Sequence, residues 1–316
     1  MRPSTDNRLI GRQLEIESNR RGTTQTPQLQ EEVEGKMAKD TFMEKYSAKI
    51  RKRVNHTRNM CRKHKNIQKM KEYPTLLVNE EHKLVYCQTP KVGTVSWCKI
   101  FLQLSGYKNR SELMNMNVIQ VSAAWKKHVP RLSDFPAAKQ KEILANYTKI
   151  MFVRNPLTRL LSAYNDKLVL KSSSDRQPYY QNTVNKRILA FFRIGGGKKR
   201  NYATFREFVR MLISKQHYIA DVHWSPMHSV CFPCSIDYDV IGQLEDIENE
   251  SNYILRHVGA DIEFPHSTGT HFTNSSSYEK VIKSYATIPR FDLLNLYQKY
   301  KYDFLLFDYN QSLAML

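Results

Sequence analysis

The sequence has no long hydrophobic run, because none of its apolar stretches approaches the about 18–20 residues that a membrane-spanning helix needs. The first 70 residues are polar throughout, so we expect no secretory signal peptide there. Acidic residues are scarce: 30 Asp and Glu face 49 Lys and Arg, and the formal charge of +19 predicts an anionic partner such as nucleic acid, an acidic membrane or a polyanionic sugar. The motif GxxxxGK[ST] is missing, which excludes the phosphate loop of nucleotide triphosphatases.

The chain of 316 residues has the composition of a globular protein, with 41% hydrophobic residues. Residues 1–36 are polar and poor in aromatic side chains, which predicts disorder. Residues 37–72 carry twelve Lys and Arg against three Asp and Glu, a net charge of +9, and are either a solvated basic stem or helix or an arm that binds polyanions. We therefore expect a polar N-terminal stem over 1–72 and a folded domain over 73–316.

Short apolar runs alternate with helical periodicity in the second part of the chain. Residues 83–87, 150–153 and 238–241 are continuously apolar or nearly so, as in strands that are buried on both faces of a parallel sheet. Each of these runs is followed by a helical pattern. The helix after residues 83–87 is expected to begin near Trp97, and the helix after residues 238–241 is expected to extend from about Glu245 to Gly259. Repeated strand–turn–helix units predict an α/β domain with a mostly parallel sheet, in which ligands bind beyond the carboxyl ends of the strands.

The turn after the first of these strands has the composition of an anion-binding loop. Gly93 permits a close approach of the backbone, Thr94 and Ser96 offer hydroxyl donors, and the backbone N–H groups at the start of the following helix suit a phosphate or sulfate. An ordinary strand–helix turn is the alternative interpretation. The candidate anion-binding residues are Pro90, Lys91, Val92, Gly93, Thr94, Val95 and Ser96.

A second motif leaves the second strand. Asn155 is a favourable helix N-cap, Pro156 suits the first helical position, and the guanidinium of Arg154 at the strand's end could bind a phosphate or simply pair with a carboxylate. Two such loops on one sheet favour the binding role. The candidate residues are Arg154, Asn155, Pro156, Leu157, Thr158, Arg159, Leu160, Leu161 and Ser162.

Together the two motifs resemble the cofactor motifs of sulfotransferases that use 3′-phosphoadenylyl sulfate. Residues 89–94 resemble the loop for the 5′-phosphosulfate, and Arg154 with Ser162 resembles the 3′-phosphate motif. Four later segments narrow the resemblance to the Golgi carbohydrate sulfotransferases, which include the chondroitin, dermatan and N-acetylgalactosamine 4-O-sulfotransferases and the enzyme of the natural-killer epitope. These segments are His223-Trp224, Cys231-Phe232-Pro233-Cys234, Tyr238-Asp239-Val240-Ile241-Gly242 and Asp303-Phe304-Leu305-Leu306-Phe307-Asp308-Tyr309.

The resemblance implies a P-loop-like sulfotransferase fold over residues 73–316, with a central, mostly parallel sheet flanked by helices. It implies an enzyme of class 2.8.2 that sulfates a glycan hydroxyl, with the 4-OH of N-acetylgalactosamine in chondroitin- or dermatan-type chains as the expected position. The expected partner is an anionic glycan and not nucleic acid, and the expected place is the lumen of the Golgi apparatus. The family's N-terminal membrane anchor has no counterpart in this sequence, and Asn155 and Cys98 stand where the family commonly has an acidic and a basic residue.

The resemblance also implies roles for single residues. Lys91 would stabilise charge on the leaving phosphate, and no metal is required. His128 lies between the two motifs, as the catalytic histidine of the wider superfamily often does, and a near-neutral imidazole is a natural acceptor for a hydroxyl proton. His223 is the rival candidate, and it could instead orient the sugar beside Trp224. The sequence leaves open whether either of them is the base.

Five cysteines leave at least one thiol unpaired within a monomer. The C-x-x-C pair Cys231 and Cys234 suggests a structural disulfide more than half a zinc site, with partners that the sequence does not reveal, and Cys87 is expected to be simply buried. N-x-[ST] sequons, which predict a glycoprotein of the secretory pathway, begin at Asn55, Asn109, Asn146, Asn249, Asn274 and Asn310.

Two other functions are compatible with parts of the sequence. A kinase-like phosphotransferase could use a similar sheet, but the triphosphate loop and an acidic magnesium pair are missing. A non-enzymatic or inactive sulfotransferase-like protein could bind polyanions through residues 37–72 and through the loop Gly195–Arg200.

Overall fold

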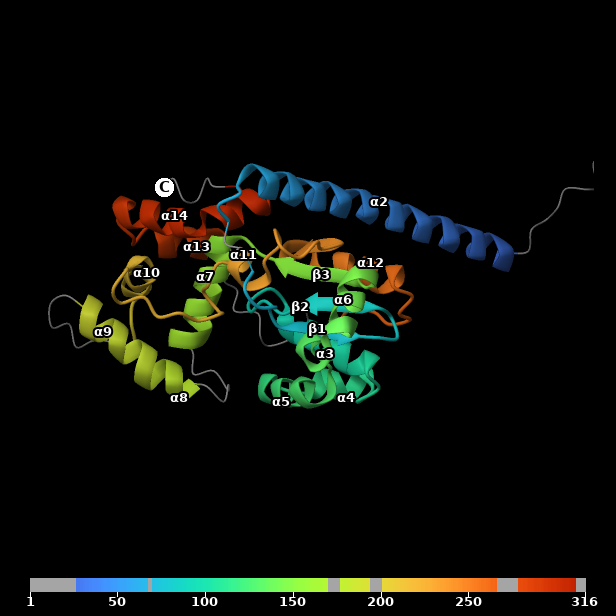
Figure 1. Cartoon of the computed structure of the whole chain (residues 1–316), viewed down its shortest axis with the longest axis horizontal. Helices are drawn as coiled ribbons and strands as arrows, with labels where there is room; N and C mark the ends of the chain where they lie inside the picture. The colour runs from blue at the N-terminus through green and yellow to red at the C-terminus, as the bar shows by residue number, and fades with distance from the viewer. Residues whose placement is uncertain (1–26, 68–69, 170–176, 194–200, 266–277, 311–316) are drawn as a thin grey trace, which may run out of the picture. The chain divides into compact units, whose positions relative to one another are not determined.

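The computed structural model of the chain describes residues 27–67, 70–169, 177–193, 201–265 and 278–310, with side chains of the first helix described from residue 36 on. The chain divides into two units, Met1–Lys45 and Tyr46–Leu316. The described residues of the smaller unit are helical and form the first part of helix α2 (Pro27–Lys63; Figure 1). The larger unit contains both predicted motifs.

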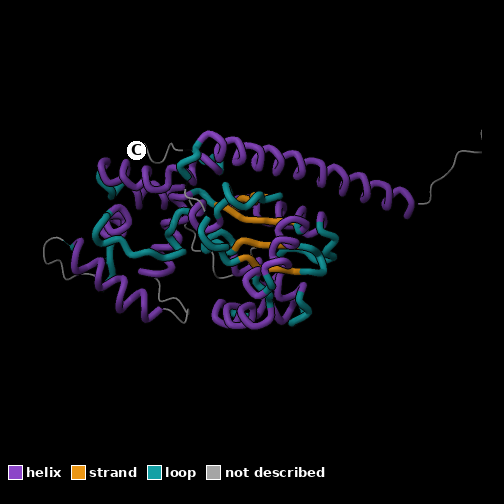
Figure 2. The backbone as a smooth tube through the Cα atoms, in the orientation of Figure 1, coloured by secondary structure: helices purple, strands orange, loops and turns teal. Residues whose placement is uncertain are grey.

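Four strands form one sheet in the order β1 (Leu76–Asn79), β2 (Leu84–Cys87), β3 (Thr148–Val153) and β4 (Val240–Gln243). Strands β2, β3 and β4 run parallel, and β1 pairs antiparallel with β2 at one edge. Figure 2 shows the strands side by side. The strand residues are almost all buried, which agrees with their continuously apolar sequence. The predicted α/β class with a mostly parallel sheet is confirmed, and β1 is the strand that the sequence did not indicate.

Helices connect and flank the strands. Helix α3 packs against β1 and α5, and helix α12 packs against β4. None of the described helices is both long and apolar enough to cross a membrane. The helices after α2 are α3 (Thr94–Leu104), α4 (Arg110–Asn115), α5 (Val118–His128), α6 (Ala137–Asn146), α7 (Pro156–Tyr164), α8 (Gln177–Tyr179), α9 (Lys186–Phe192), α10 (Phe205–Ile213), α11 (Met227–Cys231), α12 (Ile247–His257), α13 (Tyr278–Tyr285) and α14 (Arg290–Leu306), with 3₁₀ turns η1 (Leu132–Asp134) and η4 (Leu244–Asp246) and π-helical segments η2 (Asn165–Val169) and η3 (Tyr180–Asn185).

A large hydrophobic core lies among helices α7, α9, α10, α13 and α14, on the left of Figure 1. Trp224, the indole of the predicted His223-Trp224 segment, is fully buried in it and packs edge-on against Phe208 with ring centroids 5.5 Å apart. Burying a side chain of this size stabilises the fold by roughly 1.5–3 kcal/mol. The core therefore holds the segment around His223 in place.

A second aromatic layer covers the sheet beside α3. Trp97 of α3 packs on Phe152 of β3 with ring centroids 5.5 Å apart. A Cβ atom on the neighbouring Gly242 would lie 2.4 Å from the Phe152 ring, closer than any side chain can approach. This close packing explains the glycine that ends the predicted segment Tyr238–Gly242.

The second part of α2 belongs to the larger unit. Tyr46, Ile50 and Val54 are buried at helical spacing on one side of the helix. Arg53 donates hydrogen bonds of 2.8 and 2.9 Å to the two carboxylate oxygens of the fully buried Glu250. The larger unit therefore includes the second part of α2, and the division into a stem over 1–72 and a domain over 73–316 stays a prediction. The sequence predicts disorder over residues 1–36. Residues 1–26 lie outside the described residues, and residues 27–36 are helical.

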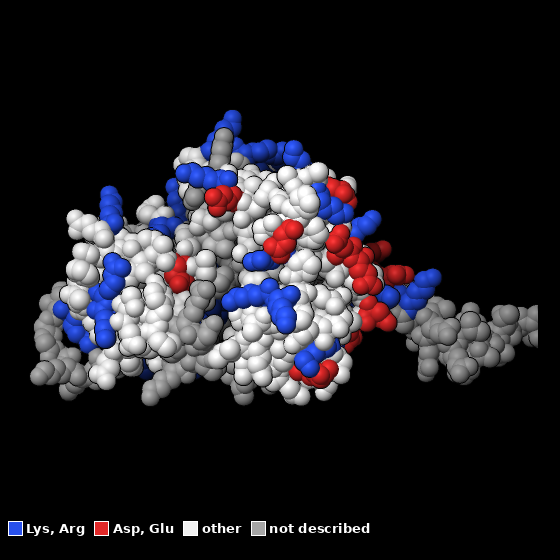
Figure 3. All heavy atoms as spheres, turned by 60° about the horizontal axis from the view of Figure 1, so that its bottom comes forward, with Lys and Arg blue, Asp and Glu red and all other residues white. Residues whose placement is uncertain are grey.

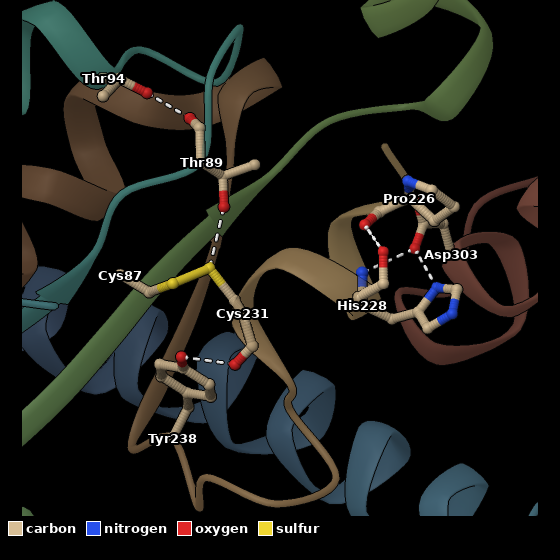
Figure 4. The surroundings of a disulfide bond; sticks show 9 residues. Cys87, Thr89, Thr94, Pro226, His228, Cys231, Tyr238 and Asp303 are labelled. Carbon is tan, nitrogen blue, oxygen red and sulfur yellow. Dashed lines mark hydrogen bonds and ion pairs between the residues drawn. A yellow bond between two sulfur atoms is a disulfide. The ribbon is translucent and has the colours of Figure 1, made fainter. Parts of the chain in front are cut away.

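Two disulfide bonds are present: one joins Cys61 to Cys234, and the other joins Cys87 to Cys231. Figure 4 shows the second of them. The disulfide interpretation of the C-x-x-C pair is confirmed, although each cysteine bonds to a distant partner and none of the four is left for zinc. Cys87 is buried, as expected, but the prediction that burial is its only role is wrong. Cys98 is the free thiol and is buried.

Candidate active site

The first motif forms the loop between β2 and α3. Lys91 and Gly93 have left-handed backbone angles, with φ of 72° and 85°. A Cβ atom on Gly93 would also lie 2.1 Å from the Cδ1 atom of Ile247, so a larger residue is strained there and must displace Ile247. Left-handed residues in a tight loop turn successive N–H groups toward one side, and the first N–H groups of α3 have no partner within the helix. The backbone of this loop therefore suits an anion.

Hydrogen bonds of two threonine side chains stabilise the conformation of this loop. The hydroxyl of Thr94 donates to the carbonyl oxygen of Thr89, and the hydroxyl of Thr89 lies 2.9 Å from the sulfur of Cys231 (Figure 4). Val92 is fully buried. The disulfide from Cys87 thus ties the base of the loop to helix α11.

The side chain of Lys91 points to an acidic partner that the sequence analysis did not single out. Its Nζ atom lies 3.2 Å from Oδ2 of Asp166 in η2, and its side chain is 18% exposed. Burial lowers the pKa of Lys91 below its ordinary value, while Asp166 opposes this shift. Burial would raise the pKa of Asp166, but Lys91 and Lys167 together hold it below its ordinary value.

The second motif lies against the first. Arg154 follows β3 directly and is 5% exposed. Its Nε atom donates to the hydroxyl of Thr158 across 3.0 Å, and its Nη1 atom donates to the carbonyl oxygen of Lys91 across 3.3 Å. Burial lowers the pKa of Arg154 to about 10, so the guanidinium is still charged at neutral pH. A buried cation of this kind suits a phosphate group.

Asn155 caps helix α7, as predicted. Its Oδ1 atom accepts hydrogen bonds from the N–H groups of Leu157, at 3.0 Å, and Thr158, at 3.4 Å. Its own N–H group donates to Oε1 of Glu245 across 3.2 Å, and Oε2 of Glu245 accepts from the hydroxyl of Tyr309. The amide oxygen of Asn155 thus fills the capping role that an acidic residue would fill.

Arg159 has another role than the cofactor-binding role expected for it. The guanidinium is 1% exposed and donates to three backbone carbonyl oxygens, of Pro90 at 3.0 Å, Val222 at 2.8 Å and Ser225 at 2.7 Å. It therefore joins the first motif to the segment around His223. The other members of the predicted range that are buried are Pro156, Leu157, Leu160, Leu161 and Ser162, and the three leucines belong to the hydrophobic core.

His223 lies in a hydrogen-bonded group with Asp221 and Tyr180. Its Nδ1 atom is 2.6 Å from Oδ1 of Asp221 and 3.1 Å from the hydroxyl of Tyr180, which donates to Oδ2 of the same aspartate across 2.9 Å. Burial lowers the pKa of His223 below its ordinary value, Asp221 opposes this shift, and the charges of Lys167 and Lys91 add to it. With Nδ1–H donating to the carboxylate, the Nε2 atom of the neutral ring is a proton acceptor.

His128 has a different environment. It ends helix α5, is exposed, and packs its ring on Tyr107 with centroids 4.2 Å apart. The electrostatic neighbours of His223 include Lys91, whereas the ring contact of His128 is with Tyr107. The structure thus brings His223 into the neighbourhood of Lys91, whereas His128 lies at the exposed end of α5.

The C-terminal segment 303–309 contacts residues that position the site. Asp303 of α14 is fully buried and accepts hydrogen bonds from the backbone N–H groups of Met227, at 2.7 Å, and His228, at 2.9 Å, and from Nδ1 of His228 at 2.7 Å (Figure 4). Asp303 thereby caps helix α11, which carries Cys231. The segment 303–309 thus has two positioning residues, since Tyr309 contacts Glu245.

The profile of the sulfotransferase family matches residues 74–310 of the chain. The chain belongs to the sulfotransferase family. It is 32% identical over 243 residues to carbohydrate sulfotransferase 10 of Xenopus laevis, an alignment that covers 75% of this chain and 67% of that protein. It is 35% identical over 245 residues to carbohydrate sulfotransferase 14 of Danio rerio (74% and 62% covered) and 27% identical over 286 residues to carbohydrate sulfotransferase 9 of Homo sapiens (86% and 62% covered).

This family member spans 62 to 67% of the length of those three relatives. No solved structure matches it. The family resemblance, the α/β sulfotransferase fold and, at the level of the family, the transferase class 2.8.2 are confirmed. The described residues contain no group of three or more His, Cys, Asp or Glu side chains that could hold a metal ion. That no metal takes part stays a prediction.

Sequence reasoning missed four side chains of the site: Asp166, Lys167, Tyr180 and Asp221. One of them had a usable signal, because an aspartate two residues before a histidine can orient its ring. Adjacent acidic and basic residues such as Asp166 and Lys167 are typical of a solvated surface, and Tyr180 lies far from both motifs in the sequence. Their role is visible only in the folded chain.

Proposed function

We propose that this sulfotransferase-family chain transfers the sulfuryl group of 3′-phosphoadenylyl sulfate to a hydroxyl group of a glycan. The contact between Arg154 and Lys91 carries this proposal, because it brings two anion-binding motifs together at the carboxyl ends of β2 and β3, where open α/β sheets bind ligands. The names of the relatives, all carbohydrate sulfotransferases, support a glycan as the acceptor.

Each end of the donor has a group that fits it. The backbone N–H groups of Gly93 and Thr94, with Lys91, would hold the 5′-phosphosulfate, and Arg154 would hold the 3′-phosphate. Lys91 would stabilise the charge that develops on the leaving phosphate. Ser162 is 2% exposed, and the guanidinium of Arg159 donates its hydrogen bonds to backbone carbonyl oxygens. We therefore propose that both residues support the shape of the site and do not contact the donor.

His223 is our choice for the base. Its Nε2 atom would accept the proton of the acceptor hydroxyl as the oxygen attacks sulfur. The new S–O bond to the glycan forms while the S–O bond to the donor phosphate breaks, and the electron pair of the broken bond stays on that phosphate. Asp221 would stabilise the imidazolium, and Tyr180 would hold Asp221 in position.

For the acceptor we propose the 4-OH of N-acetylgalactosamine in a chondroitin- or dermatan-type chain. This choice rests on the resemblance of the later sequence segments, and the charge of +19 suits an anionic glycan. Basic side chains are spread over the face that Figure 3 shows. Nucleic acid is not part of this proposal.

We place the protein in the Golgi lumen as a glycoprotein. The two disulfides support an oxidising compartment. Asn274 lies outside the described residues, and the other sequon asparagines are exposed: Asn55, Asn109, Asn146, Asn249 and Asn310. The stem over 1–72 and the catalytic domain over 73–316 remain our proposed division, with residues 46–63 packed as part of the larger unit.

A second function, polyanion binding without transfer, is favoured by one observation. Between Tyr46 and Lys71 the sequence has no acidic residue, and Lys49, Arg53 and Arg58 pair with carboxylates of the domain. Exposed cations on the same segment have no carboxylate within ion-pair distance among the described residues. They are Arg51, Lys52, Arg62, Lys63 and Lys65. The loop 195–200, the other predicted polyanion contact, lies outside the described residues.

The test is an assay of the purified chain with radiolabelled donor. The acceptors are chondroitin, dermatan, their desulfated forms and glycans that end in N-acetylgalactosamine. We expect label in the galactosamine-containing chains, at the 4-position on disaccharide analysis. Label in none of them, together with salt-sensitive retention of the same chains on the immobilised protein, would favour the second function and contradict the first.

A further inference from the structure

Lys167 is a buried cation beside the proposed site for which the reaction scheme above has no role. It lies in the π-helical segment η2, directly after α7, and its side chain is 9% exposed. Its Nζ atom is 3.1 Å from Oδ2 of Asp166, the same oxygen that lies 3.2 Å from Nζ of Lys91. One carboxylate oxygen therefore joins two ammonium groups.

The other neighbours of Lys167 belong to the group around the proposed base. Its Nζ atom lies 5.1 Å from the centroid of the Tyr180 ring, and the hydroxyl of Tyr180 contacts both Asp221 and His223. Lys167 is thus placed between Lys91, at the leaving phosphate, and His223, at the acceptor hydroxyl. In the proposed reaction, the sulfuryl group travels between those two residues.

The two lysines depend on the same ion-pair partner. Among the described residues, Lys91 and Lys167 are both paired with Oδ2 of Asp166. An ammonium group has three N–H donors, so a carboxylate oxygen shared by two lysines leaves donors of both for the oxygen atoms of an anion. A sulfuryl group has oxygen atoms on which negative charge is spread during transfer, and fixed cations beside them stabilise that charge most.

The backbone around Lys167 supports a functional role. Segments η2 and η3 are both π-helical and contact each other. Gln181 of η3 donates from Nε2 to the carbonyl oxygens of Lys167 and Leu168, at 3.4 and 3.3 Å. Single π-helical turns are rare and occur often at functional sites, because the extra residue in the turn redirects side chains.

We propose that Lys167 is a second catalytic cation, which contacts the oxygen atoms of the sulfuryl group during transfer, and that Asp166 is a positioning residue that holds Lys91 and Lys167 ready for the donor. This inference rests on the proposed function. In the proposed function, Lys91 and Arg154 contact the phosphates of the donor. The further inference is that Lys167 contacts the sulfuryl group that is transferred.

The test compares Lys167→Met with Lys149→Met. Lys149 is a matched control because it is also a buried lysine in an ion pair, at 2.8 Å from Asp239, but it lies near the amino end of β3, whereas the site lies beyond the carboxyl end. Turnover is measured with the acceptor on which the wild-type chain is active. Affinity is measured by calorimetry for 3′-phosphoadenylyl sulfate and for adenosine 3′,5′-bisphosphate, which lacks the sulfuryl group.

We expect Lys167→Met to lower kcat by about 10²-fold or more. It should weaken binding of the sulfated donor and leave binding of the bisphosphate unchanged, since only the former has the group that Lys167 contacts. Loss of this cation should also move the acidic limb of the pH profile to higher pH, because Lys167, with Lys91, opposes protonation of His223 while Asp221 favours it. Lys149→Met should change none of these three quantities.

Two outcomes would overturn the inference: a kcat within about threefold of the wild-type value, or equal losses of affinity for both nucleotides, as a merely structural role would produce. If Lys167→Met does not fold, Lys167→Arg keeps the buried charge, and its planar head should still lower kcat at least about 10-fold. Full turnover in that variant would contradict the proposal. Absence of transfer in the wild-type chain would instead contradict the proposed function.

Discussion

The Nη1 atom of Arg154 donates a hydrogen bond to the carbonyl oxygen of Lys91 across 3.3 Å. The two residues come from loops that follow different strands, and the pairing of β2 with β3 brings those loops together. This contact lets one molecule with two anionic ends meet both residues. It also couples the loops, because a shift of Arg154 would displace the backbone of the anion-binding loop.

Replacement of Lys91 by alanine should abolish sulfate transfer and leave the fold intact. The side chain is 18% exposed and makes one ion pair, with Asp166 at 3.2 Å. Because Asp166 keeps its second ion pair, with Lys167, the loss of Lys91 should cost little stability. The measurement is transfer from labelled donor, with circular dichroism and thermal unfolding as the check on folding. Full activity in a folded Lys91→Ala protein would remove the basis of the proposed reaction.

Replacement of His223 by alanine should lower kcat by about 10²–10⁴-fold, the range for loss of a general base. Replacement of His128 should leave kcat near the wild-type value, since that residue is exposed at the end of α5. Both variants are compared in one assay at saturating donor. If His128→Ala loses turnover and His223→Ala does not, the base has been assigned to the wrong histidine.

The pH profile should show an acidic limb below the ordinary histidine pKa of about 6.5. Burial lowers the pKa of His223, so the ring stays neutral, and able to accept a proton, to lower pH than an exposed histidine. Activity is then present above the lowered pKa and is lost as the pH falls through it. The profile of kcat/KM against pH measures this value, and Asp221→Asn should move the limb to still lower pH, because the carboxylate favours the protonated ring. An acidic limb above pH 7 would contradict the assignment.

Thiol counting should find one reactive cysteine in the unfolded, unreduced chain and five after reduction. The two disulfides account for four cysteines, and the remaining one, Cys98, is buried, so it should react only after unfolding. Burial raises the pKa of this thiol to about 12, which slows its reaction further in the native protein. Titration with a thiol reagent, with and without denaturant, gives the counts. Rapid reaction of the native chain would show that Cys98 is accessible.

The strands of the sheet core were predictable, because buried parallel strands such as 150–153 have a continuously apolar sequence. Strand β1 was missed, since its four residues Leu76–Asn79 are followed by a short turn and pair antiparallel at the sheet edge. Asn155 was assigned correctly as a cap, because a cap depends on neighbours in the sequence. Local patterns therefore found the elements that depend on local interactions.

The parts of the site that the sequence did not reveal depend on contacts between distant segments. Lys167 is buried and Asp166 is half-buried in η2, which packs against η3, and no local pattern separates them from an exposed charged pair. Arg159 was placed with the cofactor residues on its position in the motif, yet its partners are carbonyl groups of Pro90 and of the segment 222–225. The partners of Cys231 and Cys234 lie 144 and 173 residues away, beyond what spacing can indicate.

The disulfide pattern has a consequence for biosynthesis. Cys61 and Cys87 leave the ribosome long before Cys231 and Cys234, so the nascent chain carries two early thiols whose native partners do not yet exist. The early pair can oxidise with each other, and so can the late pair, and only thiol–disulfide exchange recovers the native arrangement from either error. A recombinant host that supplies a disulfide isomerase should therefore yield far more correctly bonded protein than one that supplies oxidant alone.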